Sequence, residues 1–331
     1  MQRRELLSLI GCGAVAWPLA VRAQHADQMR QIGMLMAYAE GDPEGQAFVA
    51  TFREGLQKHG WAEGRNIRIH VRWAKSGDPE LRQRFASELV ALGPDLITAH
   101  GTPSTATLAK QTQTIPIIFV NVTDPIGGGF VASFPRPGGN VTGFSHYEPT
   151  LAGKWLELLK EIAPRIAKVA FLFNPTTAPY ADYYLTPFKA AAPSLGVQAI
   201  VAPVRDRVEF QPIIAAQAQE SNGSLIVMPD VFTTTHRTEI ITLAARYRLP
   251  AIYPLPFFAV QGGLLSYGID SRDQYRRAAV YADRVLKGEK PGDLPVQIPV
   301  KYELVINLNT ARALNLNVPP SLIARADNVI E

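Results

Sequence analysis

Short apolar runs alternate with amphipathic stretches along almost the whole chain, and this alternation restricts the possible folds more than any other feature. Apolar runs at 32–38, 96–100 and 116–122 have the length of buried strands, and stretches with helical spacing lie between them. Strands buried on both faces and separated by helices are typical of parallel sheets covered by helices. The pattern starts again at 168–173, so the sequence predicts an α/β protein.

The number of predicted strands favours two sheets. About ten strands in roughly 300 residues, with 47% hydrophobic residues in the whole chain, fit two Rossmann-like lobes better than one. We expect the first boundary near 143–147, with helix 272–287 returning to the first lobe and strand 302–308 to the second. The expected lobes are 29–145 with 270–298, and 146–269 with 299–331, joined by three crossings. Strands are also predicted at 67–74, 140–144, 197–204, 224–228, 251–253 and 264–267, and helices at 43–59, 78–92, 102–113, 151–162, 181–195, 207–220 and 233–247.

The first 23 residues have the pattern of an export signal. Arg3 and Arg4 precede a short apolar stretch, and Val21 and Ala23 are the small residues expected before a cut. The stretch is too short to span a bilayer, and the paired arginines resemble a twin-arginine signal. We therefore expect a periplasmic protein cleaved after Ala23. Lipid anchoring at Cys12 is the alternative.

The composition excludes several classes of function. The chain has 33 Lys+Arg against 29 Asp+Glu, a net charge of +4, without a long basic block, which argues against nucleic-acid binding. A single cysteine forbids an intramolecular disulfide and a cysteine-rich metal cluster. No membrane-spanning segment is predicted. We expect no cofactor and no metal.

Residues that directly follow the strands are the candidates for ligand binding, because open parallel sheets bind ligands at the carboxyl ends of their strands. Gly101, Thr102, Pro103 and Ser104 follow strand 96–100 and open a helix. Free N–H groups at such a helix start suit a carboxylate. An ordinary capped helix is the alternative interpretation.

Two acidic residues and three tyrosines are further candidates. Asp124 and Asp230 follow strands in opposite halves, and either could pair with a ligand ammonium or cap a turn. Tyrosines at strand ends could stack on an apolar ligand or belong to the core. The complete set of expected ligand-binding residues is Tyr38, Asp42, Gly101, Thr102, Ser104, Asn121, Thr123, Asp124, Asn174, Asp230, Tyr253 and Tyr267.

Signals of catalysis are weak. The six histidines show no HExxH spacing, there is no GxSxG elbow, and 127–129 is not a nucleotide-binding glycine motif. His100, Ser104 and Asp124 could form a triad only by a chance combination of common residues. We therefore predict a protein that is not an enzyme.

Six segments, in order along nearly the whole mature chain, resemble a known family. This is the family of tryptophan-binding-type substrate-binding proteins of ABC importers. The resemblance implies the type I fold of periplasmic binding proteins, with two α/β lobes, three hinge strands and a ligand in the cleft. The segments are 98–103, 116–125, 137–143, 154–164, 286–291 and 304–311.

The resemblance also implies a ligand. Family members with assigned ligands take amino acids, often aromatic ones. By this similarity Thr102 and Ser104 match the carboxylate-binding turn and Asp124 the Thr-Asp-Pro segment, while Asn174, Asp230 and Tyr267 match strand ends of the other lobe. The segments 37–42 and 180–184 depart from aromatic-amino-acid binders.

The expected function is therefore the solute-binding component of an ABC importer. It would capture a small carboxylate-bearing solute, an amino acid or aromatic acid, by hinge closure. The expected partner is a membrane permease with its cytoplasmic ATPase, and the expected state is a monomer. An exported two-domain hydrolase and a ligand-sensing subunit of a signalling receptor are the alternatives.

Overall fold

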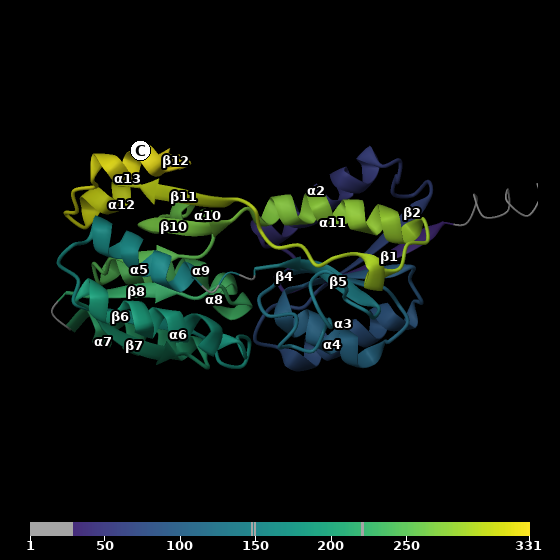
Figure 1. The fold of residues 1–331 in the computed structure, drawn as a ribbon, viewed down its shortest axis with the longest axis horizontal. Helices are drawn as coiled ribbons and strands as arrows, with labels where there is room; N and C mark the ends of the chain where they lie inside the picture. The colour runs from purple at the N-terminus through teal and green to yellow at the C-terminus, as the bar shows by residue number, and fades with distance from the viewer. Residues whose placement is uncertain (1–28, 147, 149, 220–221) are drawn as a thin grey trace, which may run out of the picture.

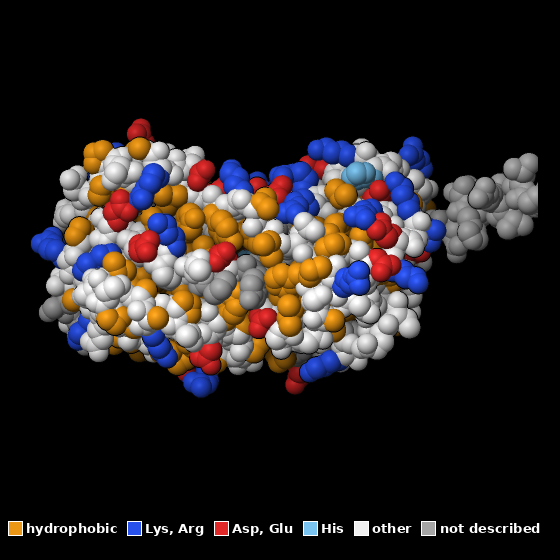
Figure 2. All heavy atoms as spheres, viewed as in Figure 1, with side chains coloured by type: hydrophobic (Ala, Val, Ile, Leu, Met, Phe, Trp, Pro, Cys, Tyr) orange, Lys and Arg blue, Asp and Glu red, His pale blue; other side chains and the backbone are white. Residues whose placement is uncertain are grey.

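Two lobes lie side by side in the computed structural model, which describes residues 29–331 except 147, 149 and 220–221 (Figure 1). Each lobe is a sheet with helices on both faces. The predicted export signal and its alternative at Cys12 lie outside the described residues. On the face shown in Figure 2, hydrophobic side chains gather around the middle of the molecule, where the lobes meet.

The N-terminal lobe contains a parallel sheet of five strands in the order β2-β1-β3-β4-β5. Its strands are rich in branched apolar residues because both faces are covered. They are β1 (Arg30–Met36), β2 (Ile67–Trp73), β3 (Leu96–His100), β4 (Ile117–Val122) and β5 (Val141–Ser145).

Four helices cover this sheet, and one of them returns from the far end of the sequence. Helix α11 lies along α2 in Figure 1. A Cβ added to Gly55 of α2 would lie 2.5 Å from the Ala279 Cβ of α11, so this glycine allows the close approach. The helices are α2 (Pro43–Lys58), α3 (Pro79–Ala91), α4 (Gly101–Gln111) and α11 (Ser271–Leu286).

The C-terminal lobe contains seven strands in the order β12-β11-β10-β9-β8-β6-β7. All neighbours are parallel except β10 and β11. The strands are β6 (Lys168–Phe173), β7 (Gln198–Pro203), β8 (Gly223–Val227), β9 (Ala251–Tyr253), β10 (Leu265–Ile269), β11 (Tyr302–Asn307) and β12 (Asn328–Ile330).

The helices of this lobe are mostly short. Helix α5 is the most strongly amphipathic, and it buries Trp155, whose indole N–H donates to the carbonyl of Tyr267 at 2.6 Å. The helices are α5 (Leu151–Ile162), α6 (Ala181–Ala191), α7 (Phe210–Gln219), α8 (Val231–Thr235), α9 (Arg237–Arg246), α10 (Pro256–Val260), α12 (Leu308–Ala313) and α13 (Pro320–Arg325). Three short 3-10 helices are η1 (Pro193–Leu195), η2 (Arg207–Glu209) and, in the N-terminal lobe, η3 (Pro291–Asp293).

The chain passes between the lobes three times. It leaves the first sheet after β5, returns between β10 and α11, and leaves again between Gln297 and β11. Gln297 forms a bridge with Phe144 of β5, which places it at the edge of the first sheet. The largest cluster of buried apolar residues includes members of both lobes, so the lobes pack against each other.

The structure confirms the predicted fold class, two α/β lobes with largely parallel sheets. Several predicted helices end differently. The single helix expected over 233–247 is divided at His236 into α8 and α9, and the one over 207–220 starts as η2. Helices α10, α12 and α13 and strand β12 are too short for a periodic signal, and the sequence did not predict them.

Replacing Gly143 with alanine should destabilise the N-terminal lobe. Gly143 has a φ of +153°, and a Cβ there would lie 2.0 Å from the carbonyl oxygen of Phe119 on the neighbouring strand. We expect Gly143→Ala to lower the free energy of unfolding by about 3 kcal/mol, measured by urea denaturation.

Gly153→Ala is the matched control. A Cβ at Gly153 in α5 would meet nothing closer than 3.8 Å. Alanine favours helix over glycine, so this variant should be as stable as the native protein or more stable by up to about 1 kcal/mol. Equal destabilisation by both substitutions would contradict the steric argument.

Candidate functional site

A small cavity lies between the lobes, at the carboxyl ends of the strands of both sheets. Its volume is about 20 Å³, which is room for about one water molecule. The parallel strands explain its place, because their carboxyl ends carry the loops that form ligand sites. It is lined by Tyr38, His100, Thr102, Asn121, His146, Tyr180, Pro229, Asp230, Val231, Thr234 and Leu255.

The start of α4 forms one wall of the cavity and has unused hydrogen-bonding groups. The helix starts without a side-chain cap, and a helix start carries free N–H groups and partial positive charge. The hydroxyls of Thr102 and Ser104 are buried and have no hydrogen-bond partner among the described residues. This wall can therefore donate several hydrogen bonds to an anionic group.

Asp230 lies on the opposite wall, where it caps α8. Its Oδ1 accepts from the backbone N–H of Phe232 and from the Thr177 hydroxyl, and its Oδ2 accepts from the N–H of Asn174 at 2.9 Å. Burial raises the pKa of Asp230 to about 6, although these hydrogen bonds oppose the shift. No described Lys or Arg forms an ion pair with it, so a cationic ligand group would supply its missing counter-charge.

Two buried histidines between these walls are neutral. Burial lowers the pKa of His100 to about 3 and that of His146 to about 4. The Nδ1 of His100 lies 2.8 Å from the hydroxyl of Tyr275, and the Nε2 of His146 lies 2.7 Å from Oδ1 of Asn121. An amide oxygen can only accept, so His146 carries its proton on Nε2.

Asn121 connects the cavity to two of the chain crossings. It has a φ of +62°, rare for a residue other than glycine, at an irregularity in the pairing of β4 with β5. Its Nδ2 donates to the hydroxyl of Ser271, and its backbone N–H donates to Oε1 of Gln274. Gln274 in turn donates to the carbonyl of Ser145 at 3.0 Å.

Eight of the twelve sequence-predicted residues lie at or beside the cavity. Tyr38, Thr102, Asn121 and Asp230 line it. The other four lie near lining residues or are bonded to them: Gly101 directly precedes Thr102, Ser104 lies two residues after it in α4, Thr123 lies near the hydroxyl of Tyr180, and Asn174 donates to Asp230.

The remaining four predicted residues do not line the cavity, because each has another partner. Asp124 accepts from the N–H of Gly127 within its own turn. Asp42 forms an ion pair with an arginine of the other lobe. Tyr253 is buried against Phe258, and Tyr267 stacks on Tyr302.

Seven lining residues were not among the predicted site residues. His100, Pro229 and Val231 are next to predicted residues at strand ends, so a wider reading of the same rule would have found them. Tyr180 belongs to a segment that departs from the resembled family. His146 lies at a chain crossing, and Thr234 and Leu255 carry no signal that sequence reasoning could use.

The geometry gives no catalytic arrangement for the triad considered above. The Nδ1 of His100 is bonded to Tyr275, and the Asp124 carboxylate caps its own turn. Within the described residues, no group of three His, Cys, Asp or Glu side chains could hold a metal ion. In the same part of the chain, no helix combines the length and the apolar character needed to cross a bilayer.

The chain belongs to the family described as ABC transporter substrate binding protein, whose sequence model matches residues 37–330. The resemblance drawn from the sequence motifs is therefore confirmed. Members of this family act outside the cytoplasm. The protein is a solute-binding protein and not an enzyme.

Among the proteins that this chain resembles are one matched by sequence and two matched by structure. A tyrosine-binding protein of Clostridioides difficile (strain R20291) is 29% identical over 265 residues, which cover 80% of this chain and 75% of the relative. A Streptococcus pneumoniae ABC domain in complex with L-Trp has a TM-score of 0.84 at 26% identity, covering 92% of this chain and all of the other. A ligand-free, open substrate-binding protein of Clostridium difficile with adhesive properties has a TM-score of 0.66 at 25% identity, covering 91% and 99%.

The raised pKa of Asp230 predicts a pH-dependent stability. Because its pKa is 3.8 in the unfolded chain and about 6 in the native protein, the native state binds the proton more tightly. Lowering the pH from about 6 to about 4 should therefore stabilise the native state, by up to about 1.4 kcal/mol per pH unit.

Urea denaturation of the native protein and of Asp230→Asn between pH 4 and 7 measures this contribution. The difference in unfolding free energy, native minus variant, should increase as the pH falls through that range. A difference that is independent of pH would contradict the raised pKa.

Proposed function

We propose that this protein is the extracytoplasmic solute-binding component of an ABC importer and that it captures an amino acid between its lobes by hinge closure. One observation carries the proposal. Among the described residues, the buried hydroxyls of Thr102 and Ser104 have no hydrogen-bond partner and mark an uncapped helix start. On the opposite wall of the cavity that Thr102 lines, the buried carboxylate of Asp230 has no counter-ion in the same part of the chain.

These two walls complement the two charged groups of an α-amino acid. The ligand carboxylate binds at the start of α4, where the helix dipole, free N–H groups and both hydroxyls stabilise negative charge. The ligand ammonium pairs with Asp230, whose ionised form it favours. Tyr38, Tyr180 and the neutral ring of His100 surround the ligand body and favour an aromatic side chain. An aromatic acid would use the α4 wall alone.

Two observations support hinge closure. A cavity of about 20 Å³ is far smaller than the several hundred Å³ of ordinary ligand pockets, so the lobes must separate before a solute can enter. The structure matches the L-Trp complex better than the ligand-free, open relative, although both are equally distant in sequence. This closer match supports a closed arrangement of the lobes.

Export and transport complete the proposal. The first 23 residues direct export to the periplasm, and cleavage after Ala23 releases a chain without cysteine, because Cys12 is the single cysteine of the sequence. The closed, ligand-bound monomer then docks on a membrane permease driven by a cytoplasmic ATPase. Membership of the ABC transporter family supports this partner.

Removing the two hydroxyls should weaken the binding of L-tryptophan or L-tyrosine. A hydrogen bond to a charged group contributes about 1.5–3 kcal/mol, so Thr102→Val and Ser104→Ala should each raise the dissociation constant about 10- to 100-fold. Isothermal titration calorimetry measures the effect.

Thr105→Val is the matched control on the same helix. The Thr105 hydroxyl already donates to the carbonyl of Gly101, so this variant should bind the amino acid like the native protein. Native affinity in both Thr102→Val and Ser104→Ala would place the ligand elsewhere.

Pairing of the ligand ammonium with Asp230 predicts that affinity depends on pH. The ammonium needs the ionised carboxylate, and the pKa of Asp230 is about 6. Affinity for the amino acid should therefore fall below about pH 6, approaching tenfold per pH unit. Indole-3-propionate, which lacks the ammonium, should bind more weakly than L-tryptophan at pH 7. Its affinity should not fall as the pH is lowered below about 6. The same pH profile for both compounds would contradict the pairing.

A further inference from the structure

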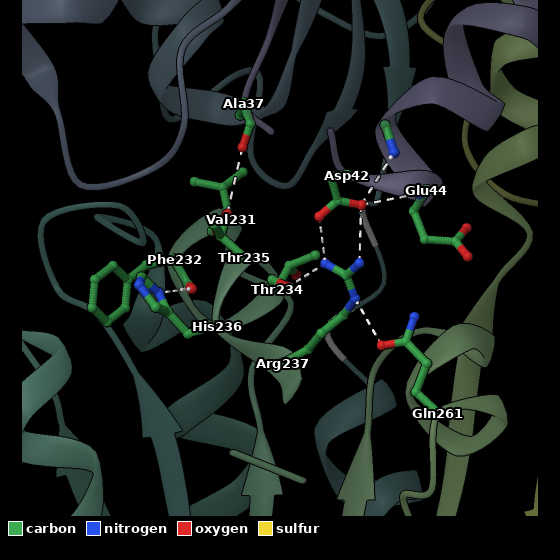
Figure 3. Close-up of polar contacts among 11 residues, drawn as sticks. Ala37, Asp42, Glu44, Val231, Phe232, Thr234, Thr235, His236, Arg237 and Gln261 are labelled. Atoms are coloured by element: carbon green, nitrogen blue, oxygen red, sulfur yellow. Dashed lines mark hydrogen bonds and ion pairs between the residues drawn. The ribbon is translucent and has the colours of Figure 1, made fainter. Parts of the chain in front are cut away.

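A buried ion pair joins the two lobes beside the cavity. Nη1 of Arg237 lies 2.8 Å from Oδ2 of Asp42, and Nη2 lies 2.9 Å from Oδ1, so the guanidinium holds both carboxylate oxygens. The side chain of Arg237 is 6% exposed and that of Asp42 is 11% exposed. Figure 3 shows the two groups facing each other across the boundary between the lobes.

Each member of the pair is held in place by its own lobe. Asp42 caps α2, where Oδ1 accepts from the N–H of Glu44 at 2.9 Å. Arg237, the first residue of α9, donates from Nε to Oε1 of Gln261 and from Nη1 to the carbonyl of Thr234. Its guanidinium also lies over the ring of Phe257, 5.4 Å from the centroid. Separation of the lobes would break the ion pair and leave all these contacts intact.

The contacts around the pair also cross between the lobes. The Thr235 hydroxyl reaches the carbonyl of Ala37 at 3.5 Å, and a Cβ added to Gly101 would lie 2.7 Å from Cγ1 of Val231. The neighbours Tyr38 and Thr234 line the cavity, but Asp42 and Arg237 do not. The pair therefore bridges the lobes at the edge of the cavity and not through the ligand site.

We propose that Asp42 and Arg237 set the ratio of closed to open molecules, and through it the affinity for the solute, without touching the solute. This proposal rests on the hinge closure of the proposed function. If the solute binds tightly only to the closed form, the apparent dissociation constant is the intrinsic one divided by the closed fraction. Residues that change this fraction change affinity from outside the site.

The local partners explain why the pair can favour closure. A buried ion pair is stabilising only when its geometry is good and its remaining groups are hydrogen-bonded, because both charges lose water. Here the helix start already stabilises the Asp42 carboxylate, and Gln261, Thr234 and Phe257 hold the guanidinium in its orientation. Closure then adds two charge-assisted hydrogen bonds between preoriented groups.

Distances between spin labels on the two lobes test the proposal. The full chain carrying Cys12→Ser has no other cysteine, so labels can be attached to Lys110→Cys on α4 and Lys189→Cys on α6. Both positions are exposed, and these helices lie on the same side of the two lobes in Figure 1. Pulsed electron paramagnetic resonance without added solute then gives the fractions of closed and open molecules.

Two single variants remove the ion pair in different ways. Asp42→Asn removes the charge and keeps a good helix cap, and Arg237→Gln removes the guanidinium. Each should lower the closed-to-open ratio by at least about tenfold. The double variant should be no more open than the more open single variant, because both act on one contact. Arg237→Lys, which cannot bind both oxygens, should be intermediate.

Glu239→Gln is the matched control. It also removes an ion pair of α9, but its partner Arg207 belongs to the same lobe, so the label distances should not change. Urea denaturation shows which variants are folded, and only these are compared. Native distance distributions in both folded single variants would overturn the proposal.

Titration with L-tryptophan and L-tyrosine separates this proposal from the proposed function. If either binds, its apparent dissociation constant should rise in the variants in proportion to the measured loss of closed molecules. An unchanged dissociation constant despite a loss of closed molecules would overturn the link to affinity. Binding of neither amino acid to the native protein would count against the proposed ligand, while the label distances still decide the role of the pair.

Discussion

The direction of the strands is the constraint on which the rest of the structure depends. Both sheets point the carboxyl ends of their parallel strands at the boundary between the lobes, so the helices that follow these strands start there. Helix starts carry partial positive charge and free N–H groups. The boundary between the lobes therefore favours negatively charged groups. Asp42 occupies the start of α2 and Asp230 that of α8, whereas α4 starts without a side-chain cap.

The two capping carboxylates differ in one respect that separates structure from ligand binding. Asp42 has a buried arginine as its counter-ion, whereas Asp230 has hydrogen bonds from neutral groups only, among the described residues. An ionised carboxylate with a cation beside it has no need of a ligand ammonium. One without a cation keeps a raised pKa and gains from a cationic ligand. The charges at the boundary therefore divide into a pair that joins the lobes and a residue suited to a solute.

The positions of most strands and their largely parallel direction could be predicted from the sequence, and with them Tyr38, Thr102, Asn121 and Asp230 of the cavity, because apolar runs locate the strand ends. The order of the strands within each sheet was not predicted. Competing partners could not be predicted. Asp42 pairs with Arg237, 195 positions away, and no sequence feature near either residue indicates this ion pair. The Asp124 carboxylate accepts a hydrogen bond from a backbone N–H of its own turn, which was the alternative that the sequence also allowed. The short helices α10, α12 and α13 were missed because they depend on tertiary packing and not on periodicity.

The hydrogen bonds of Asn121 have a mechanical consequence. Together with Gln274 they link the first crossing, at Ser145, to the second, at Ser271. Hydrogen bonds therefore hold these two crossing segments together. The third crossing, 298–301, lies outside both sheets, and Val300 is 84% exposed. The third crossing is also joined to the first, because the carbonyl of Gln297, where it begins, accepts from the N–H of Ser145 at 2.8 Å. All three crossings are therefore held together where they meet the N-terminal lobe, and the proposed hinge closure would bend them on the side that faces the C-terminal lobe.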